Sequence, residues 1–258
     1  MSDQLVLENL YRLDGRVSIV TGASSGIGMR IAQVLAAAGS TVYAVARRAD
    51  RLAALAESNN LIRPCPGDLA DRTDRARVVA DVIEREGRID VLVNNAGISN
   101  IAPAIDETTI DLERVLEVNL VAVFDLCREA GRQMLSQPSG GSIINIASIV
   151  GLVGLGRMPQ AAYSASKGAV VNLTRELAAQ WARKGVRVNA IAPGWFDTEL
   201  TSELFATDQG TAWVNRITPM GRGGAGNELD GPVLLLAGPG GTYMTGAIIP
   251  VDGGWTAV

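Results

Sequence analysis

Residues 16–38 constrain the fold most strongly, because a buried strand, a glycine-rich turn and a helix follow one another directly. Residues 16–21 (RVSIVT) are rich in β-branched and apolar side chains, which is typical of a strand inside a sheet. The turn TGASSGIG occupies 21–28, and residues 29–38 carry apolar side chains at helical spacing up to Gly39. This order predicts a parallel α/β unit whose glycines let the backbone approach a nucleotide pyrophosphate at the start of the helix.

The alternation of strand and helix continues to the end of the chain. Six further segments have the composition of strands: 41–46, 61–65, 90–93, 141–147, 186–192 and 246–251. Helical periodicity covers 71–86, 111–136, 161–183 and 228–237. The pattern predicts an α/β chain with a single Rossmann-type, doubly wound domain over 1–258, with about seven parallel strands and helices on both faces. We expect 1–13 to be a lead-in, and 199–227, which lack a clear period, to form a substrate loop.

Composition excludes several classes of function. The 258 residues include no histidine, which excludes Ser-His-Asp and Cys-His catalysis and histidine-bound zinc, and we expect no metal site. A net charge of −4 without a basic run argues against nucleic acid and membrane surfaces. No apolar run reaches the ~18 residues of a transmembrane helix, and the polar start does not resemble a signal peptide, so we expect a cytoplasmic protein. Cys65 and Cys127 are isolated and are expected to be reduced, buried thiols.

Acid–base chemistry is therefore left to other side chains, and Tyr163 and Lys167 are the leading candidates. They are four residues apart on a predicted helix, so they lie on one face of it. An ammonium beside a phenol favours the phenolate and lowers a phenol pKa from its usual value of about 10. Ser148 ends the strand at 141–147 and could hydrogen-bond a carbonyl oxygen as charge develops there. Such a set suits proton transfer at a C–O group while a hydride moves at its carbon.

Asn119 lies inside the helix predicted at 111–136, an unfavourable position for asparagine. One interpretation is a local kink that holds a water molecule near the active site. The other is a buried amide whose hydrogen bonds are satisfied. The pattern alone does not separate them.

The turn after the second strand bears on the choice of nucleotide. A ribose with a free 2′-hydroxyl is usually held by an acidic residue at this point, whereas a 2′-phosphate suits arginine. Here the strand ends at Ala46 and is followed by Arg47 and Arg48, while the nearest carboxylate, Asp50, lies in the next helix. Guanidinium groups can bind phosphate through two hydrogen bonds, which favours NADP(H) over NAD(H). The alternative is that one or both arginines only cap a solvated turn.

Parallel strands end at one edge of a sheet, so all these features are expected to line one cleft. Together the motifs resemble the short-chain dehydrogenase/reductase family over residues 13–258. The matching motifs are TGASSGIG at 21–28, DL at 68–69, NNAG at 94–97, Asn119, Ser148, Tyr163-x-x-x-Lys167, PG at 193–194 with Thr198, and VDGG at 251–254.

The resemblance implies roles for the catalytic candidates. Tyr163 would be the general acid in reduction and the base in oxidation, and Ser148 would hold the substrate oxygen. Lys167 would lower the pKa of Tyr163 and bind the nicotinamide ribose, and Asn119 would anchor a water in a proton relay. The family also implies a homo-oligomer, a tetramer in which the last helix and strand form an interface.

The strand-end argument and the resemblance together assign a nicotinamide cofactor to one set of residues. The set is Gly22, Ser24, Ser25, Gly26, Ile27, Gly28, Arg47, Arg48, Asp68, Leu69, Asn95, Ala96, Gly97, Tyr163, Lys167, Pro193, Gly194, Phe196 and Thr198.

The expected substrate is a small molecule with an apolar body. Candidate pocket residues are mainly apolar: Ile149, Val153, Met158, Gln160, Trp195 and residues within 199–215. Arg157 could pair with an anionic substrate, although an exposed surface arginine is the preferred interpretation. We therefore expect an NADP(H)-dependent reductase of a ketone or 3-oxoacyl group that also runs as a secondary-alcohol dehydrogenase. The alternatives are an NAD(H)-dependent polyol or sugar-acid dehydrogenase, or a non-catalytic nucleotide sensor, against which the presence of Ser148, Tyr163 and Lys167 argues.

Overall fold

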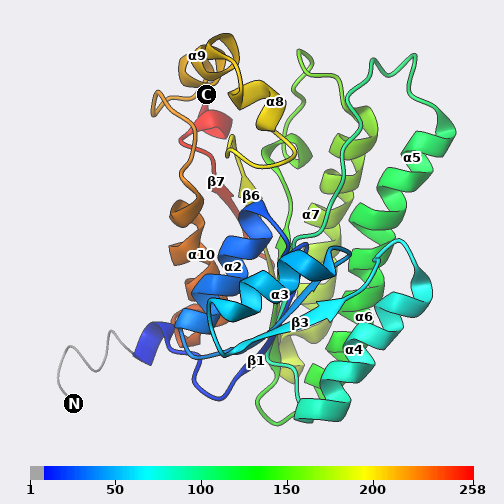
Figure 1. The fold of residues 1–258 in the computed structure, drawn as a ribbon, viewed down its shortest axis with the longest axis vertical. Helices are drawn as coiled ribbons and strands as arrows, with labels where there is room; N and C mark the ends of the chain where they lie inside the picture. Colours follow the sequence, from blue (N-terminus) through cyan, green and yellow to red (C-terminus); the bar gives the residue numbers. More distant parts are fainter. Residues whose placement is uncertain (1–8) are drawn as a thin grey trace.

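A computed structural model of the protein describes residues 9–258, and it is organised around one parallel sheet (Figure 1). The seven strands lie in the order β3-β2-β1-β4-β5-β6-β7 and all neighbouring pairs are parallel. Their bounds are β1 Val17–Thr21, β2 Thr41–Ala46, β3 Ile62–Pro66, β4 Val91–Asn94, β5 Gly141–Ile146, β6 Val186–Pro193 and β7 Ile248–Val251. The order reverses between β1 and β4, so the predicted doubly wound sheet is confirmed.

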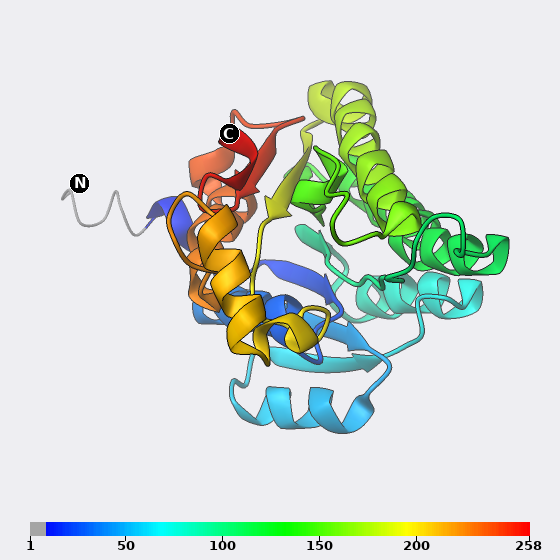
Figure 2. The same cartoon turned by 90° about the horizontal axis from the view of Figure 1, so that it is seen from above.

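Helices cover both faces of the sheet (Figure 2). The bounds of the α-helices outside the segment 199–227 are α2 Gly26–Ala37, α3 Ala49–Glu57, α4 Arg72–Glu86, α5 Thr109–Leu116, α6 Ala122–Ser136, α7 Ala161–Trp181 and α10 Asp230–Ala237. Helices α2, α3 and α10 pack on one face, and α4, α6 and α7 pack on the other. Short 3-10 turns extend α7 at Ala182–Lys184 and precede α10 at Gly226–Leu229.

Two hydrophobic cores follow from the alternation of side chains along each strand. In β1, Ile19 belongs to the core beneath α4 and α6, whereas its neighbour Val20 belongs to the core beneath α2 and α10. Ile143 and Ile144 in β5 divide in the same way. Successive residues of a strand point to opposite faces, so strands that are apolar throughout supply both cores at once.

The helix predicted at 111–136 is interrupted, and the interruption centres on Asn119. Helix α5 passes into a π-helical turn over Glu117–Val121, and α6 begins at Ala122. Such a turn contains one residue more than a regular helical turn, which displaces the following segment. Residues 109–136 are nevertheless helical throughout, close to the predicted 111–136, and the irregular turn at Asn119 agrees with the interpretation of a local kink.

The segment 199–227 contains helices that the sequence pattern did not predict. Helix α8 covers Ser202–Phe205 and α9 covers Asp208–Ile217. The side chain of Thr207 caps α9 by accepting a hydrogen bond from the Gly210 amide, and Val214 is buried on its inner face. Because α8 and α9 are short and are separated by a capping residue, neither contains enough residues at helical spacing to be recognised from the sequence.

Other expectations concern the chain start and the cysteines. Most of the predicted lead-in lies in residues 1–8, outside the described part of the chain, while Leu13 is fully buried in the core.

Cys65 and Cys127 are free, buried thiols, and burial raises the pKa of Cys127 to about 12. Within residues 9–258 there is no metal-binding cluster of acidic and sulfur ligands, and no helix is long and apolar enough to cross a membrane.

Candidate active site

The glycine-rich turn after β1 opens a cleft at the carboxyl edge of the sheet. Gly22 and Gly26 adopt φ angles of 67° and 51°, which side chains rarely tolerate. A Cβ atom at Gly28 would overlap the Gly22 carbonyl and the Asn95 amide, so α2 can pack this closely only with glycine there. Helix α2 begins at Gly26, three residues before the predicted start, so its free amide groups face the cleft.

Hydrogen bonds join this turn to the end of β4. The Thr21 hydroxyl accepts hydrogen bonds from the backbone amides of Asn95 at 2.9 Å and Ala96 at 3.0 Å. The Asn95 side chain donates to the Thr21 carbonyl at 2.9 Å. The two strand ends on either side of the reversal in strand order are therefore fixed relative to one another, which gives the cleft a rigid floor.

Two connected hollows follow the carboxyl edge. A cleft of about 430 Å³ extends over the glycine turn, Arg47, Arg48, Asp68 and Leu69. A smaller cavity of about 130 Å³ contains Ser148, Tyr163 and Lys167. Ile27, Asn95, Gly97, Thr198 and Leu200 line both. Every residue that the sequence assigned to the cofactor lines one hollow or the other.

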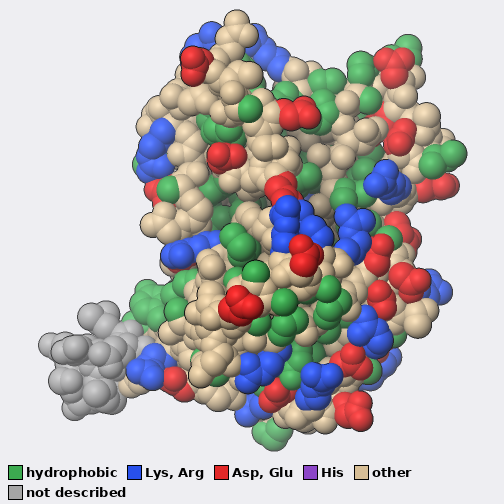
Figure 3. All heavy atoms as spheres, in the orientation of Figure 1, with side chains coloured by type: hydrophobic (Ala, Val, Ile, Leu, Met, Phe, Trp, Pro, Cys, Tyr) green, Lys and Arg blue, Asp and Glu red, His purple; other side chains and the backbone are tan. Residues whose placement is uncertain are grey.

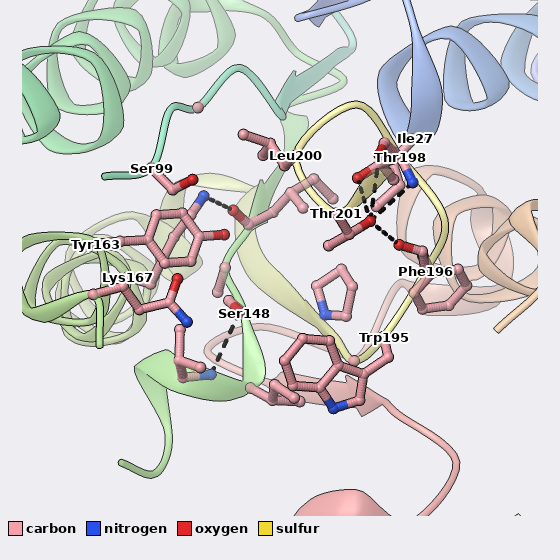
Figure 4. Close-up of a pocket in the computed structure, with 18 of the residues that line it drawn as sticks. Ile27, Ser99, Ser148, Tyr163, Lys167, Trp195, Phe196, Thr198, Leu200 and Thr201 are labelled. Atoms are coloured by element: carbon pink, nitrogen blue, oxygen red, sulfur yellow. Dashed lines mark hydrogen bonds between the residues drawn. The ribbon is translucent and has the colours of Figure 1, made fainter. Parts of the chain in front are cut away.

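Tyr163, Ser148 and Lys167 converge in the smaller cavity (Figure 4). Tyr163 and Lys167 come from the first two turns of α7, and Ser148 follows the end of β5. Ser148 also caps the next turn, where its hydroxyl accepts a hydrogen bond from the Val150 amide. Figure 4 shows the Tyr163 and Ser148 hydroxyls directed into the cavity, with Trp195, Thr201 and Leu200 on its opposite side.

The ammonium of Lys167 lies closer to the backbone than to the phenol. Its Nζ donates a 2.7 Å hydrogen bond to the Ile146 carbonyl and lies 5.7 Å from the centre of the Tyr163 ring. Burial lowers the pKa of Lys167 to about 8. Burial also raises the pKa of Tyr163, and the hydrogen bond with Ser148 opposes this effect. The expected lowering of the phenol pKa by Lys167 is thus absent in the protein alone, because desolvation of the phenol dominates.

Asn119 connects the π-helical turn to the loop after β4. Its Oδ1 accepts a hydrogen bond from the Ile98 amide, and its Nδ2 donates to the Ile98 carbonyl, both at 2.9 Å. Nδ2 also donates to the Ser166 hydroxyl at 3.0 Å. The side chain is fully buried, so the satisfied amide and the helix kink occur together. Asn119 does not line the cavity, and its role in a water relay stays a prediction.

The substrate side of the cavity differs in part from expectation. Ile149, Met158, Gln160 and Trp195 line it as predicted. Val153 does not line the cavity. Its side chain lies at the protein surface, where the residue is 41% exposed. Within 199–215 only Leu200 and Thr201 reach the cavity. Leu204, Phe205 and Val214 of α8 and α9 pack in one cluster with Trp195, whose ring meets that of Trp213 edge-on at 5.1 Å. Arg157 is exposed and lies outside the cavity, as the preferred interpretation required.

Several residues of the site were not predicted from the sequence. Ser99 and Ile101 line the cavity, and their place just after NNAG at a strand end could have indicated them. Glu199, which lines the nucleotide cleft, and Arg51, which is hydrogen-bonded to it, were not predicted either. The Glu199 carboxylate accepts hydrogen bonds from both Arg48 and Arg51 across the cleft, a contact between distant segments that no local pattern indicates.

Comparison with known proteins agrees with this geometry. The family described as enoyl-(acyl carrier protein) reductase matches residues 22–256. Galactitol 2-dehydrogenase (L-tagatose-forming) of Cereibacter sphaeroides is 39% identical over 96% of this chain and 97% of its own length. The chain belongs to the short-chain dehydrogenase/reductase family. The 3-oxoacyl-(acyl-carrier-protein) reductase of Thermotoga maritima is 38% identical over 94% of this chain and 98% of its own.

A solved relative has the same fold throughout. Gluconate 5-dehydrogenase of Burkholderia cenocepacia J2315, in complex with NADP and tartrate, superposes with a TM-score of 0.91 at 35% identity, covering 98% of this chain and 99% of that one. The predicted class of activity, an NAD(P)-dependent oxidoreductase acting on alcohols and carbonyls, is confirmed for this dehydrogenase/reductase.

The residues of this dehydrogenase/reductase fit a dinucleotide. The positive φ angles and closely packed glycines leave a cradle of backbone amides at the start of α2, and the cleft leads directly into the catalytic cavity. The glycine turn would hold the pyrophosphate, and Lys167 with Asn95 would hold the nicotinamide half. When bound, the nicotinamide supplies or accepts the hydride. The chain's own contribution would be to orient the substrate oxygen with Ser148 and to exchange a proton with it through Tyr163.

Proposed function

We propose that this protein is an NADP(H)-dependent oxidoreductase that interconverts a small, neutral secondary alcohol and its ketone, with polyols and ketoses as the first substrate class. In reduction, the Tyr163 phenol donates a proton to the carbonyl oxygen while the Ser148 hydroxyl donates a hydrogen bond to it. In oxidation, the Tyr163 phenolate accepts the alcohol proton. Asn119 supports the loop that carries Ile98 beside the nicotinamide half of the cleft.

The neutrality of the substrate rests on one observation. Among the described residues, Lys167 is the only charged side chain that lines the catalytic cavity, and its ammonium is already hydrogen-bonded to the Ile146 carbonyl. A buried carboxylate is costly without a partner cation, and an anionic substrate would find no unengaged cation among the residues that line the cavity. The remaining lining combines apolar walls with the side chains of Ser99, Gln160 and Thr201, which can bind hydroxyl groups.

The cofactor preference rests on the arginines at the end of β2. Arg47 lies in the cleft without a hydrogen bond or ion pair to any residue of the described chain, and Arg48 contacts Ser24 and Ser25 of the glycine turn. No carboxylate follows β2 at the point where it would meet a ribose 2′-hydroxyl. These features support NADP(H). The Arg48 side chain faces the cleft, which argues against a purely capping role.

A substrate panel tests the proposal. The protein is assayed with NADP⁺ and NAD⁺ on galactitol and threitol as neutral polyols and on gluconate as an anion, and with NADPH on an acetoacetyl thioester. We expect kcat/KM to be highest for a neutral polyol with NADP⁺. Gluconate turnover that exceeds polyol turnover would contradict the neutral substrate. A thioester reduced faster than any polyol is oxidised would favour the 3-oxoacyl alternative instead.

We further propose that residues 1–258 act as one cytoplasmic domain that assembles as a homotetramer. Support for assembly comes from the C-terminal part of the chain, where β7 is an edge strand with exposed neighbours such as Tyr243 and Val258. Light scattering on the purified protein measures the number of subunits directly. A monomeric mass at micromolar concentration would contradict the tetramer.

A further inference from the structure

The Glu199 carboxylate spans the nucleotide cleft and binds the groups expected to recognise phosphate. It accepts hydrogen bonds of 2.9 Å from each terminal nitrogen of Arg48 and of 2.5 Å from Arg51. It also accepts one of 2.8 Å from the Ser25 hydroxyl. Glu199 belongs to the segment after β6, whereas its partners belong to the glycine turn and to the start of α3. Figure 3 shows basic side chains gathered at the middle of this face with acidic side chains directly beside them.

The donors around Glu199 match what a phosphate monoester requires. Arginine guanidinium groups bind phosphate and carboxylate through the same paired hydrogen bonds. The Arg48 guanidinium is fully engaged by Glu199 and the serines of the turn, whereas Arg47, its neighbour at the end of β2, has no hydrogen bond or ion pair with a described residue. Glu199 and Arg48 line the same cleft as the glycine turn. The carboxylate therefore occupies an anion site at the end of the cleft where the adenosine would lie.

We propose that Glu199 is an internal competitor of the cofactor 2′-phosphate and thereby sets the preference between NADP(H) and NAD(H). In the protein without cofactor its carboxylate binds Arg48, Arg51 and Ser25. The 2′-phosphate of NADP(H) displaces the carboxylate from these donors, whereas NAD(H), which lacks that phosphate, leaves the contact in place. Arg51 is thereby a phosphate-binding residue. This inference rests on the NADP(H) preference proposed above.

The contact also connects the two ends of the cleft. Leu200, the next residue, lines both the nucleotide cleft and the catalytic cavity, and Thr201 lines the cavity (Figure 4). The Thr201 hydroxyl donates a 2.5 Å hydrogen bond to the Phe196 carbonyl, which anchors the segment on its far side. Release of Glu199 therefore removes one of the contacts that hold residues 198–201, of which Leu200 and Thr201 line the catalytic cavity. Binding of the 2′-phosphate at Arg48 and Arg51 therefore affects the substrate cavity through residues 198–201.

Binding titrations of Glu199→Gln test the proposal without any turnover. Dissociation constants of NADPH and NADH are measured by nucleotide fluorescence for the wild type, Glu199→Gln and Glu203→Gln. Glu203 is an exposed acid four residues away without a hydrogen bond or ion pair in the described chain, so it controls for the change in net charge. We expect Glu199→Gln to tighten NADPH binding by about three- to tenfold, the sum of two exposed ion pairs, and to change NADH binding less than twofold. Glu203→Gln is expected to change neither.

A second variant, at Arg51, tests whether the hydrogen-bond donors around Glu199 bind the 2′-phosphate. Arg51→Ala is expected to weaken NADPH binding about threefold and to leave NADH binding unchanged. Three results would overturn the proposal. The first is an NADPH affinity in Glu199→Gln equal to that of the wild type. The second is weaker binding of both NADPH and NADH by Glu199→Gln, which would show that Glu199 stabilises the bound nucleotide as a whole. The third is failure of NADPH to bind either protein. Absence of turnover with every substrate would refute the proposed function while a selective gain in NADPH affinity would still support the competitor.

Discussion

The ammonium of Lys167 donates a 2.7 Å hydrogen bond to the Ile146 carbonyl. Ile146 is the last residue of β5, and Ser148 follows two positions later. The strand end therefore positions both the cation and the hydroxyl that flank Tyr163. Lys167 is 4% exposed, and burial of its charge costs free energy of folding.

That cost predicts an unusual pH dependence of stability. Burial lowers the pKa of Lys167 from 10.5 to about 8. The unfolded chain therefore binds the extra proton between about pH 8 and 10.5, and the contribution of Lys167 to the free energy of unfolding rises across that window. At pH 7 the shift corresponds to about 3 kcal/mol of destabilisation. Lys167→Met is expected to be inactive yet no less stable than the wild type at pH 7.

Urea unfolding of both proteins between pH 7 and pH 10 measures this effect. The difference in unfolding free energy between Lys167→Met and the wild type cancels the titration of other groups and should shrink as the pH rises. A difference that does not vary with pH would show that Lys167 is not buried as a cation.

Loss of the Ser148 hydroxyl should change the pH profile as well as the rate. The hydrogen bond from Ser148 lowers the pKa of Tyr163 against the larger effect of burial. Ser148→Ala removes it, so the pKa of Tyr163 rises further and alcohol oxidation, which needs the phenolate, shifts to higher pH. Removal of a donor to the developing oxyanion is also expected to lower kcat by about 10²-fold. A pH–rate series for oxidation tests both effects, and a profile displaced to lower pH would contradict the assignment.

We expect Asn119 to hold the loop at Ile98 in place rather than to contact the substrate. Asn119→Ala leaves the Ile98 amide and carbonyl without partners, and it should lower the free energy of unfolding by about 2–4 kcal/mol. Asn227→Ala, at an exposed asparagine without side-chain hydrogen bonds in the described chain, should change it by less than about 0.5 kcal/mol. Urea denaturation compares the two variants. Equal, small effects would show that the amide network around Ile98 contributes little.

The glycine cradle yields a paired prediction. Gly28→Ala would place a Cβ against the Gly22 carbonyl and Asn95, so it should destabilise the protein by about 2 kcal/mol or more and weaken nucleotide binding. Gly231 lies in α10 with open space around it, and Gly231→Ala should stabilise the helix by about 0.5–1 kcal/mol. Thermal unfolding with and without NADPH separates the two. If NADPH raises the melting temperature of Gly28→Ala as much as that of the wild type, the glycine turn does not bind the nucleotide as described.

Much of this architecture could be predicted because its signals are local. β1, β2, β4 and β5 are short runs rich in apolar and β-branched residues, and their predicted ends lie within one or two residues of those observed. The cofactor residues follow strand ends, which topology alone brings to one edge. The same reasoning placed Ser148, Tyr163 and Lys167 in one cavity.

The features that could not be predicted depend on contacts between distant segments. The π-helical turn at Glu117–Val121 is stabilised where Asn119 meets Ile98, a contact made across 21 positions in the chain. Helix α9 is buried against Trp195 through Val214, so its stability comes from packing rather than from its own short period. The pKa of Tyr163 depends on the depth of the site, which the spacing of Tyr163 and Lys167 does not reveal.

The central claim is that the Tyr163 phenol exchanges the proton with substrate at the carboxyl edge of the sheet. Tyr163→Phe keeps the ring and removes only the hydroxyl, and Tyr243→Phe, at a fully exposed tyrosine, is its matched control. The decisive measurement is kcat for NADPH oxidation with the best ketone of the panel, alongside the NADPH dissociation constant of each variant. The account predicts a loss of about 10²- to 10⁴-fold in kcat for Tyr163→Phe, with NADPH affinity within twofold of the wild type and Tyr243→Phe unchanged. A Tyr163→Phe protein that retains the wild-type kcat would contradict it.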